Sequence, residues 1–431
     1  MKTWLNQLWT PTGILTVFMF LLPWQTRYIF GWSWLSGSFT PFGIISLYAT
    51  QAGVLCALLG VYLWHGWPRI NSQYRTALGW AGVVGVIAVI SSVMVAVSIP
   101  ALAWLIDFSF AGLIFIALLD KRVNLPVVMS GFVLGLLLPI ALGLYQVIVG
   151  ESGASKWLGL APRSAEALGD AVWQAPDGQR MLRAYGSFSH PNIFGGYLAV
   201  GFLLAMSGLA TRLKHFQWPL CFILAFGLAL TASRSALLGC LLGGGLWLLV
   251  RYFRPTTVVR KLVMPIAVTV IGAALSVTLL APGLAASLRG GGELETRSLS
   301  ERVIQYQDFP ATLSWQTLAF GHGPRNYVFT QADLHPNKSV WEYQPIHNVP
   351  LLVLSEVGVL GLLALIGWMI ALDRLNFSRF PHPDAALAHG LGKVLFVIIF
   401  FDHYLWSNWS GLVLATIVAS FLLRAGEPSS D

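Results

Sequence analysis

Long apolar runs separated by short polar connections recur along the whole chain of 431 residues. An α-helix needs about 20 mostly apolar residues to cross the roughly 30 Å hydrocarbon core of a membrane, and most of these runs reach that length. The pattern predicts an all-α polytopic membrane protein with a single membrane domain over residues 1–431. We expect about twelve transmembrane helices, at residues 11–31, 41–64, 77–97, 100–119, 124–149, 190–211, 216–231, 234–252, 260–281, 346–373, 385–401 and 408–424.

Two long polar segments, residues 150–189 and 282–345, interrupt this alternation. We expect both to lie on the same side of the membrane and to contain short helices. A polar segment of this size held against a bilayer suggests chemistry on a substrate that arrives through the lipid.

The composition agrees with a membrane protein, because 56% of the residues are hydrophobic and only 10% are charged. In soluble domains about a quarter of the residues are charged. Basic residues also orient the predicted helices, since short cytoplasmic loops are enriched in Lys and Arg. The residues that fall on one side, and so predict the cytoplasm, are Lys2, Arg69, Arg75, Lys121, Arg122, Arg212, Lys214, Arg251, Arg254, Arg260, Lys261, Arg374, Arg379 and Arg424.

In this orientation both termini are cytoplasmic and the two long segments face outward. The net charge of +8 then reflects membrane topology, and we do not interpret it as nucleic-acid binding. The three cysteines lie within predicted helices without paired spacing, which favours neither a disulfide framework nor a thiolate metal site. No cluster has metal-ligand spacing, and Gly321-x-Gly323 lacks the Lys-Ser/Thr of a P-loop, so we expect no cofactor.

Arg234 stands between two apolar runs with almost no loop around it. An ionisable group in such a place costs several kcal/mol unless it meets water, a partner or a ligand. One interpretation is an arginine that extends to lipid headgroups. The other is an anion contact at the outer membrane surface. Arg302 follows Ser298, Ser300 and Glu301, which resemble a helix start, and it is either a solvated charge or a second anion contact.

His347 opens the tenth predicted helix and Asn348 follows it. A histidine there can be neutral near pH 7 and act as a base, or it can simply cap the helix. Glu356 lies within the same helix and would be costly without a partner, for which Arg234 and Arg302 are candidates. Further candidate substrate-binding residues come from the two outer segments and the helix starts that follow them, namely Arg183, His190, Asn192, Arg325, Asn326, Asn348 and Glu356.

Three sequence blocks together resemble the O-antigen ligase superfamily, which also includes O-antigen polymerases and bacterial O-linked oligosaccharyltransferases. They are Gly186-Ser-Phe-Ser-His-Pro-Asn192, Ser233-Arg234-Ser235, and the array Arg302, Gly321-x-Gly323, Asn326, His347-Asn348 and Glu356-x-Gly358. The resemblance covers about residues 180–375 by motif and the whole chain by topology.

The resemblance implies a glycosyltransferase of the bacterial inner membrane that takes a glycan from undecaprenyl diphosphate on the periplasmic face, without a metal or nucleotide. It assigns the functional arginines to Arg234 and Arg302, the essential histidine to His347, and a further contact to Arg183. Guanidinium groups would stabilise the charge that accumulates on the departing diphosphate. His347 would accept or orient the proton of the acceptor hydroxyl, and direct displacement would invert the anomeric centre.

The possible activities of this superfamily differ in the acceptor of the glycan. A ligase transfers onto lipid A-core, a polymerase onto another lipid-linked glycan, and an oligosaccharyltransferase onto a protein hydroxyl. We favour the ligase, because protein-glycosylating members often carry an extra C-terminal region, whereas this sequence ends soon after its last predicted helix. A lipid-glycan flippase or secondary transporter is the alternative of a different class, and Asp107 within the fourth predicted helix is the main feature that favours it.

Overall fold

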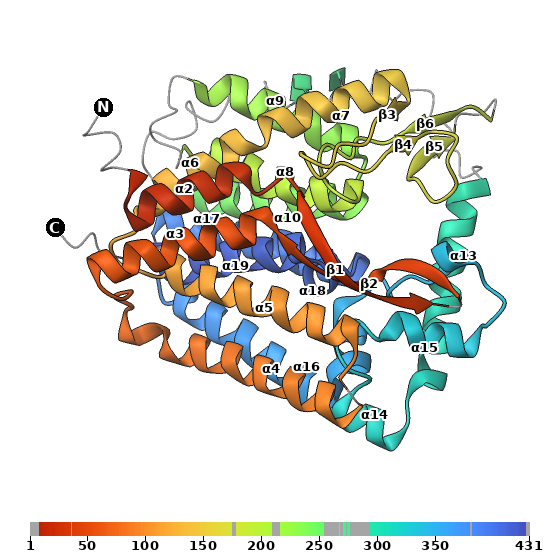
Figure 1. Ribbon diagram of the computed structural model, residues 1–431. Helices are drawn as coiled ribbons and strands as arrows, with labels where there is room; N and C mark the ends of the chain where they lie inside the picture. The colour runs from red at the N-terminus through yellow and green to blue at the C-terminus, as the bar shows by residue number, and fades with distance from the viewer. Residues whose placement is uncertain are drawn as a thin grey trace.

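The computed structural model describes residues 8–35, 37–95, 97–174, 178–208, 216–253, 267, 270–272, 274–275, 293–379 and 382–427. These residues form a mostly helical bundle whose long helices run roughly side by side, with strands and short helices gathered at one end (Figure 1). The apolar helices are α2 (Pro11–Leu21), α3 (Ala49–His65), α4 (Arg75–Met94), α5 (Ile99–Leu118), α6 (Leu125–Gly135), α7 (Leu137–Val149), α8 (Pro191–Met206), α9 (Gln217–Thr231), α10 (Arg234–Tyr252), α16 (Val349–Phe377), α17 (Pro383–Phe401) and α19 (Trp409–Arg424).

Six helical segments in this part of the chain are long and apolar enough to cross a membrane, and five shorter apolar helices accompany them. The six are Ser72–Met94, Ile99–Leu118, Leu125–Val149, Arg234–Tyr252, Val349–Phe377 and Pro383–Phe401. The expectation of a multi-pass helical membrane protein is therefore confirmed. The predicted helix at 260–281 lies almost entirely outside the described residues, so the count of twelve stays a prediction.

The all-α prediction is wrong at the first two predicted helices. Helix α2 ends at Leu21, two residues before Pro23, and α3 begins only at Ala49. Between them, β1 (Arg27–Leu35) and β2 (Ser38–Tyr48) pair as an antiparallel hairpin. Proline cannot continue a helix, and aromatic residues at every second position are typical of a strand. The aromatic residues at those positions, each at least half exposed, are Tyr28, Phe30, Trp32 and Trp34.

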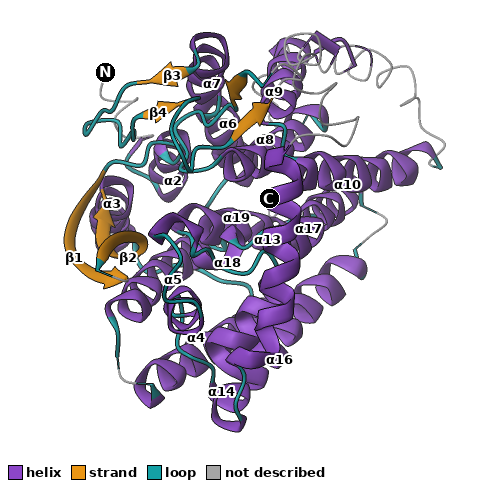
Figure 2. Cartoon of the chain, turned by 90° about the vertical axis from the view of Figure 1, so that its right-hand side faces the viewer, coloured by secondary structure: helices purple, strands orange, loops and turns teal. Residues whose placement is uncertain are grey.

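The outer segment at 150–189 also differs from expectation. It contains two short strand pairs, β3 (Glu151–Ser152) with β4 (Arg163–Ser164) and β5 (Val172–Gln174) with β6 (Arg180–Leu182), where we expected short helices. Figure 2 shows these strands at the same end of the molecule as the hairpin. An extended strand of two or three residues leaves no apolar periodicity to detect, which explains the error.

The second outer segment does contain short helices where it is described. They are α13 (Glu293–Asp308), η3 (Phe309–Thr312), α14 (Trp315–Phe320), α15 (Tyr327–Leu334) and η4 (Val340–Glu342), with η1 (Ser72–Tyr74) and α18 (Tyr404–Ser407) elsewhere in the chain. Because α13 already begins at Glu293, Ser298 is not at its start as expected, and Arg302 lies well inside the helix.

The opposite end of the bundle is rich in basic residues. Arg122 forms a 2.7 Å ion pair with Asp120 and donates to backbone carbonyls of the connection after α3. Arg424 at the end of α19 donates to two carbonyls around the start of the α5–α6 connection, and Arg379 donates to the carbonyl of Leu423. Basic residues from distant connections thus gather at one end, as the sequence predicts, which leaves the outer segments at the other.

Helix α16 is interrupted at Gly358, whose φ of 72° and ψ of −176° are not helical. The carbonyls freed by this kink accept hydrogen bonds from a glycine-containing turn: the His322 amide donates to the Ser355 carbonyl and the Gly323 amide to the Glu356 carbonyl, both at 2.8 Å. Two motifs far apart in the sequence, Gly321-x-Gly323 and Glu356-x-Gly358, are therefore partners in one backbone contact.

Glycine is required on both sides of this contact. A Cβ atom at Gly321 would collide with the backbone of Glu356, and one at Gly358 would collide with the carbonyl of Ala319. Both glycines also have positive φ values, which side chains rarely adopt. The two motifs therefore have a structural function that fixes the second outer segment against α16.

Candidate functional site

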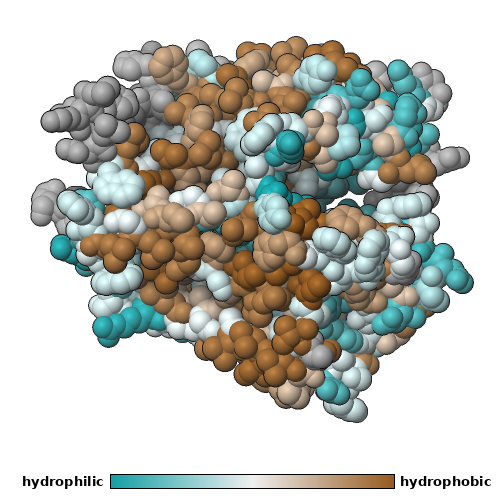
Figure 3. Space-filling view, in the orientation of Figure 1, coloured by the Kyte–Doolittle hydropathy of each residue, from teal (hydrophilic) through white to brown (hydrophobic). Residues whose placement is uncertain are grey.

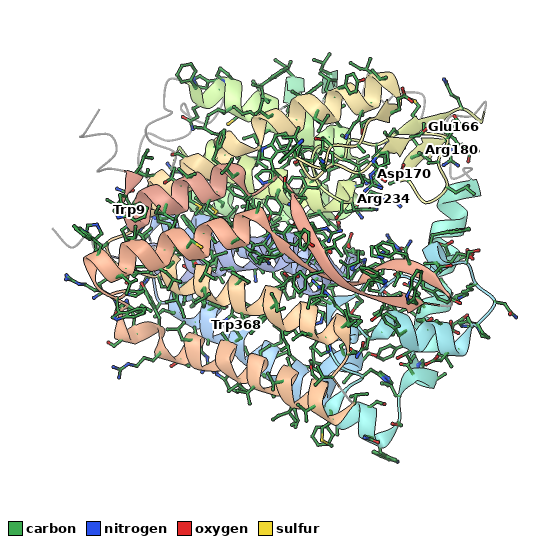
Figure 4. All side chains as sticks on the ribbon, in the orientation of Figure 1. Trp9, Glu166, Asp170, Arg180, Arg234 and Trp368 are labelled. Carbon is green, nitrogen blue, oxygen red and sulfur yellow. The ribbon has the colours of Figure 1, made fainter. Side chains whose placement is uncertain are left out.

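A cavity of about 850 Å³ lies at the end of the bundle that carries the outer segments. Polar residues gather on that side of the surface, whereas apolar residues cover the flanks of the helices (Figure 3). Figure 4 labels Arg234, Asp170, Arg180 and Glu166 on this side of the molecule, with Arg234 the nearest of the four to the middle of the view. The predicted residues that line the cavity are Arg183, His190, Asn192, Arg234, Arg302 and His347. The structure thus brings together residues that lie as far apart in the sequence as positions 183 and 347.

Three helix N-termini meet at this cavity. His190 is the N-cap residue of α8, Arg234 is the first residue of α10, and His347 precedes the Asn348 N-cap of α16. Unpaired amides and the helix dipole give each N-terminus a partial positive charge, which attracts anions. The same positive charge disfavours an arginine, so Arg234 is placed against its local preference. This arrangement is suited to an anionic ligand.

Helix α8 holds this site in the middle of the fold. Every residue of α8 is buried except Asn192 near its start, and the helix packs against α9, α10, α17 and α19. Gly195 lies against Thr231 and Ser233, so α8 closely approaches the turn before α10. In that turn Ala232 has a φ of 52° and the Ser233 hydroxyl caps α10. The close packing fixes His190 and Arg234 relative to one another.

Arg183 is half-buried and only partly committed to internal bonds. Its Nε donates to the Thr231 carbonyl at 2.9 Å, and one terminal nitrogen donates to Asn192 Oδ1 at 2.8 Å. Burial lowers the pKa of Arg183 to about 10, with Arg234 and Arg302 adding to the effect, so it stays a cation at neutral pH. Arg302, on α13, has a buried Nε with no hydrogen-bond partner among the described residues. Such an unpaired charged donor is typical of a ligand contact.

His347 lies beside a second histidine that the sequence analysis did not single out. Its Nδ1 is 3.2 Å from Gln305 Oε1, and its ring packs edge-on against His403 with centroids 5.3 Å apart. Burial lowers the pKa of His347 to about 3, and the positive charges of His403 and Arg302 act in the same direction, while Asp402 opposes them. The imidazole is therefore neutral at pH 7.

His190 is neutral for the same reason. Burial lowers its pKa to about 3, assisted by the charge of Arg183 and opposed by Asp402. Its Nδ1 accepts a hydrogen bond from the Asn192 amide at 3.2 Å, which caps α8. His190 therefore lines the cavity and also has a clear structural function at the start of α8.

Asp402 and His403 were missed by the sequence analysis. Asn192 Nδ2 donates to Asp402 Oδ2 at 2.7 Å, which links Asp402 through Asn192 to Arg183. Burial acts to raise the pKa of Asp402, but neighbouring His403 and His347 and the bond from Asn192 outweigh it, so the pKa lies below its usual value. Burial lowers the pKa of His403. Asp402 thus adjoins His403 and is joined through Asn192 to Arg183, and its isolation between two apolar runs was the signal that could have identified it.

Four candidate residues lie outside the cavity lining. Arg325 Nη2 pairs with Asp107 Oδ2 at 2.7 Å and its Nε donates to the Ser407 carbonyl. Glu356 accepts from Trp406 Nε1 at 2.7 Å, so neither Arg234 nor Arg302 is its partner, contrary to expectation.

The remaining two have capping or bridging roles. Asn348 caps α16 by accepting from the Leu351 amide at 3.0 Å. Asn326 accepts from the Ser98 hydroxyl at 2.9 Å and donates to the His322 carbonyl at 2.8 Å. All four residues therefore have internal hydrogen-bond partners outside the cavity lining. Within the described residues, no group of three or more His, Cys, Asp or Glu side chains could hold a metal ion.

Residues 219–366 match the family described as O-antigen ligase. The matched segment runs from α9 into α16 and includes Arg234, Arg302, His347 and Glu356. It confirms the resemblance to the O-antigen ligase superfamily that the sequence motifs predict. No curated protein matches the chain.

Proposed function

We propose that this relative of the O-antigen ligases transfers a glycan from undecaprenyl diphosphate to lipid A-core at the periplasmic face of the bacterial inner membrane. The family match supports an enzyme of the ligase or polymerase kind that acts on glycan and lipid substrates. The observation that carries the finer proposal is the cavity itself, where Arg183, Arg234 and Arg302 lie together with the neutral His347.

The arginines are suited to the diphosphate of the donor. Arg183, Arg234 and Arg302 come from three different parts of the chain and line one cavity. Charge grows on the diphosphate as the glycosidic bond breaks, and positioned guanidinium groups stabilise that charge. The cavity also reaches two exposed apolar side chains, Leu238 and Phe401, beside which an isoprenoid chain could lie.

His347 is suited to the acceptor. When Nδ1–H donates to Gln305 Oε1, Nε2 carries no proton and can accept one. The acceptor hydroxyl oxygen then forms the new bond to the anomeric carbon, the bond to the diphosphate oxygen breaks with its electron pair, and Nε2 takes the hydroxyl proton. This single displacement inverts the anomeric centre and uses no metal or nucleotide, as the resemblance implies.

The feature that favoured a transporter has a structural explanation. Asp107 is buried and bound on both oxygens, with Gln51 Nε2 on one and Arg325 on the other, each at 2.7 Å. A proton or ion relay needs an ionisable group that faces a cavity or pathway. The saturated partners of Asp107 support a structural ion pair instead.

The decisive experiment is incubation of the purified protein with undecaprenyl-diphosphate glycan and, in separate reactions, lipid A-core, a second lipid-linked glycan or an acceptor protein, with EDTA present. We expect a new glycosidic bond to lipid A-core and none with the His347→Ala variant. A product with the second glycan identifies a polymerase, and one with protein an oligosaccharyltransferase. Movement of intact donor across a vesicle membrane without a new bond identifies a flippase.

The orientation of the chain in the membrane can be tested separately. Cysteines introduced at Lys156 and Glu295, in a background without the exposed Cys56, should react with an impermeant thiol reagent in intact spheroplasts. Labelling only after lysis would reverse the topology and exclude a periplasmic site.

A further inference from the structure

The outer part of the cavity differs from the arginine-lined part in carrying tryptophans on two walls. Trp173 on strand β5 belongs to the first outer segment, and Trp341 in η4 belongs to the second. In Figure 1 β5 and β6 lie on one side of this region, and α15, which precedes η4, lies on the other. Two segments far apart in the sequence therefore each present an indole to one cavity.

Trp173 carries an unsatisfied donor. Its Nε1 is buried and has no hydrogen-bond partner among the residues that the structure describes. Leaving a buried donor unpaired costs about 1–3 kcal/mol, so such atoms are rare unless a ligand or another group completes them. Val172 and its partner Leu182 pack into the apolar cluster of the loop, so the alternation of β5 places Trp173 on the opposite face. The indole is therefore not needed for the packing of its own loop.

The wall that carries Trp173 is held rigidly. Arg163 Nη1 pairs with Asp170 Oδ1 at 2.7 Å, its other terminal nitrogen donates to the Ser189 carbonyl at 3.0 Å, and its guanidinium lies 4.4 Å from the centre of the Tyr185 ring. These contacts tie the segment before β5 to the start of α8. A wall fixed in this way is preorganised, which reduces the entropy lost when a ligand binds.

The opposite wall offers a more open surface. The Trp341 side chain is 57% exposed, and Gln305 Nε2 donates to the Gln344 carbonyl, which connects η4 to α13 beside Arg302. An indole presents a flat apolar face with one N–H at its edge. A pyranose ring presents the complementary features, an apolar face of C–H groups and a rim of hydroxyls that can accept from Nε1.

We infer that Trp173 and Trp341 form a subsite for a sugar ring of the glycan, separate from the arginines that contact the diphosphate. This inference rests on the proposed function for the nature of the ligand. The sugar can come from the donor, beyond its first residue, or from the acceptor. The subsite would select glycans by length and ring structure, which the diphosphate contacts cannot do.

The test compares Trp173→Ala, Trp173→Phe and Trp341→Ala with a matched control, Trp157→Ala. Trp157 lies in the same outer segment as Trp173, is 80% exposed and does not line the cavity. Phenylalanine at 173 keeps an aromatic face and removes only a donor that has no internal partner, so this variant should fold normally. Transfer kinetics are measured with donors of one sugar and of several repeats, each with complete and truncated acceptors.

We expect KM for the long donor to rise about fivefold in Trp173→Ala and Trp341→Ala and by less in Trp173→Phe, since one lost contact of this kind is worth about 1 kcal/mol. The single-sugar donor and the Trp157→Ala control should be unaffected. If the rise instead follows the sugar content of the acceptor, the same subsite holds the acceptor glycan. Kinetics equal to the control for every donor and acceptor would overturn the inference.

A binding measurement separates this inference from the proposed function. Saturation-transfer NMR with the free oligosaccharide should show contact with the wild-type protein and loss of contact in Trp173→Ala. Absence of any transfer product, with this binding intact, would contradict the proposed reaction and leave the sugar subsite. Normal transfer without variant-dependent binding would contradict the subsite and leave the reaction.

Discussion

His347 should act as a base over a wider acidic range than an ordinary histidine. Its pKa is lowered to about 3 by burial, with neighbouring positive charges adding to the effect. Protonation removes the base, so the rate falls as pH drops through the pKa of His347. With a pKa of about 3 roughly 99% of the imidazole is still neutral at pH 5, whereas with the usual value of about 6.5 only about 3% would be. The two cases differ by about thirtyfold.

The parameter that reports this difference is kcat/KM, because it reflects the free enzyme, whereas kcat reflects the enzyme–substrate complex. We expect kcat/KM to stay nearly constant between pH 8 and pH 5. In kcat the acid limb should lie at higher pH, because the bound diphosphate is negatively charged and favours the imidazolium. The assay is transfer of a fluorescent lipid-linked glycan in proteoliposomes across this pH range, for the wild type and His347→Ala.

Stability at low pH is the necessary control. Between about pH 3 and 6.5 the unfolded chain binds protons that buried His190 and His347 do not, so stability falls as pH drops through this window. Size-exclusion profiles at pH 5 must therefore show folded protein. A thirtyfold loss of kcat/KM from pH 8 to pH 5 in folded wild type, absent in His347→Ala, would refute the lowered pKa. Equal kcat in both proteins would refute His347 as the base.

Three further changes test other contacts. Arg234→Lys and Arg302→Lys should each lose about a hundredfold in turnover while staying folded, because lysine keeps the charge without the planar fork that grips a diphosphate. Near-normal turnover of both variants in transfer assays would show that the two arginines only contact lipid headgroups. Arg325→Met should lower the free energy of unfolding by about 3–5 kcal/mol, because it leaves Asp107 buried and unpaired. The double variant with Asp107→Leu should recover much of this loss. A loss of activity without destabilisation would instead place Arg325 in substrate binding. Gly358→Ala should destabilise by about 2–4 kcal/mol, from the positive φ and the collision with the α14 backbone, and unchanged unfolding in a thermal scan would contradict the kink.

The sequence singled out Arg234 because it is an ionisable group isolated between apolar runs, where only a special environment tolerates it, and His347 because it opens an apolar helix after a long polar segment. Asp402 follows the same rule and could have been found in the same way. The ion pair between Arg325 and Asp107 could not be predicted from the sequence. Asp107 lies in α5, and only the packing of α5 against the second outer segment brings the two residues together.

The hairpin shows the limit of apolar content as a signal. Residues 27–48 are apolar enough to extend both flanking helices, and the run length alone favours a longer helix. The period of two in Tyr28, Phe30, Trp32 and Trp34 opposes that interpretation, because in a helix these residues would spread around the axis, whereas in a strand they share one face. The two-residue spacing of the aromatic side chains was therefore a better guide to the secondary structure of residues 27–48 than their hydrophobicity.

The convergence of the site follows from where its motifs stand relative to the helices. His190, Arg234 and His347 each lie at the start of an apolar helix, and helices that begin at the same side of a bilayer present their N-termini to one surface. Burial lowers the pKa values of both His190 and His347, and the charges of Arg183 and Arg302 act in the same direction, so positive charge at this surface disfavours imidazolium and favours an anion. The reaction proposed above needs a neutral base beside a bound anion, and this arrangement of helices would meet both requirements.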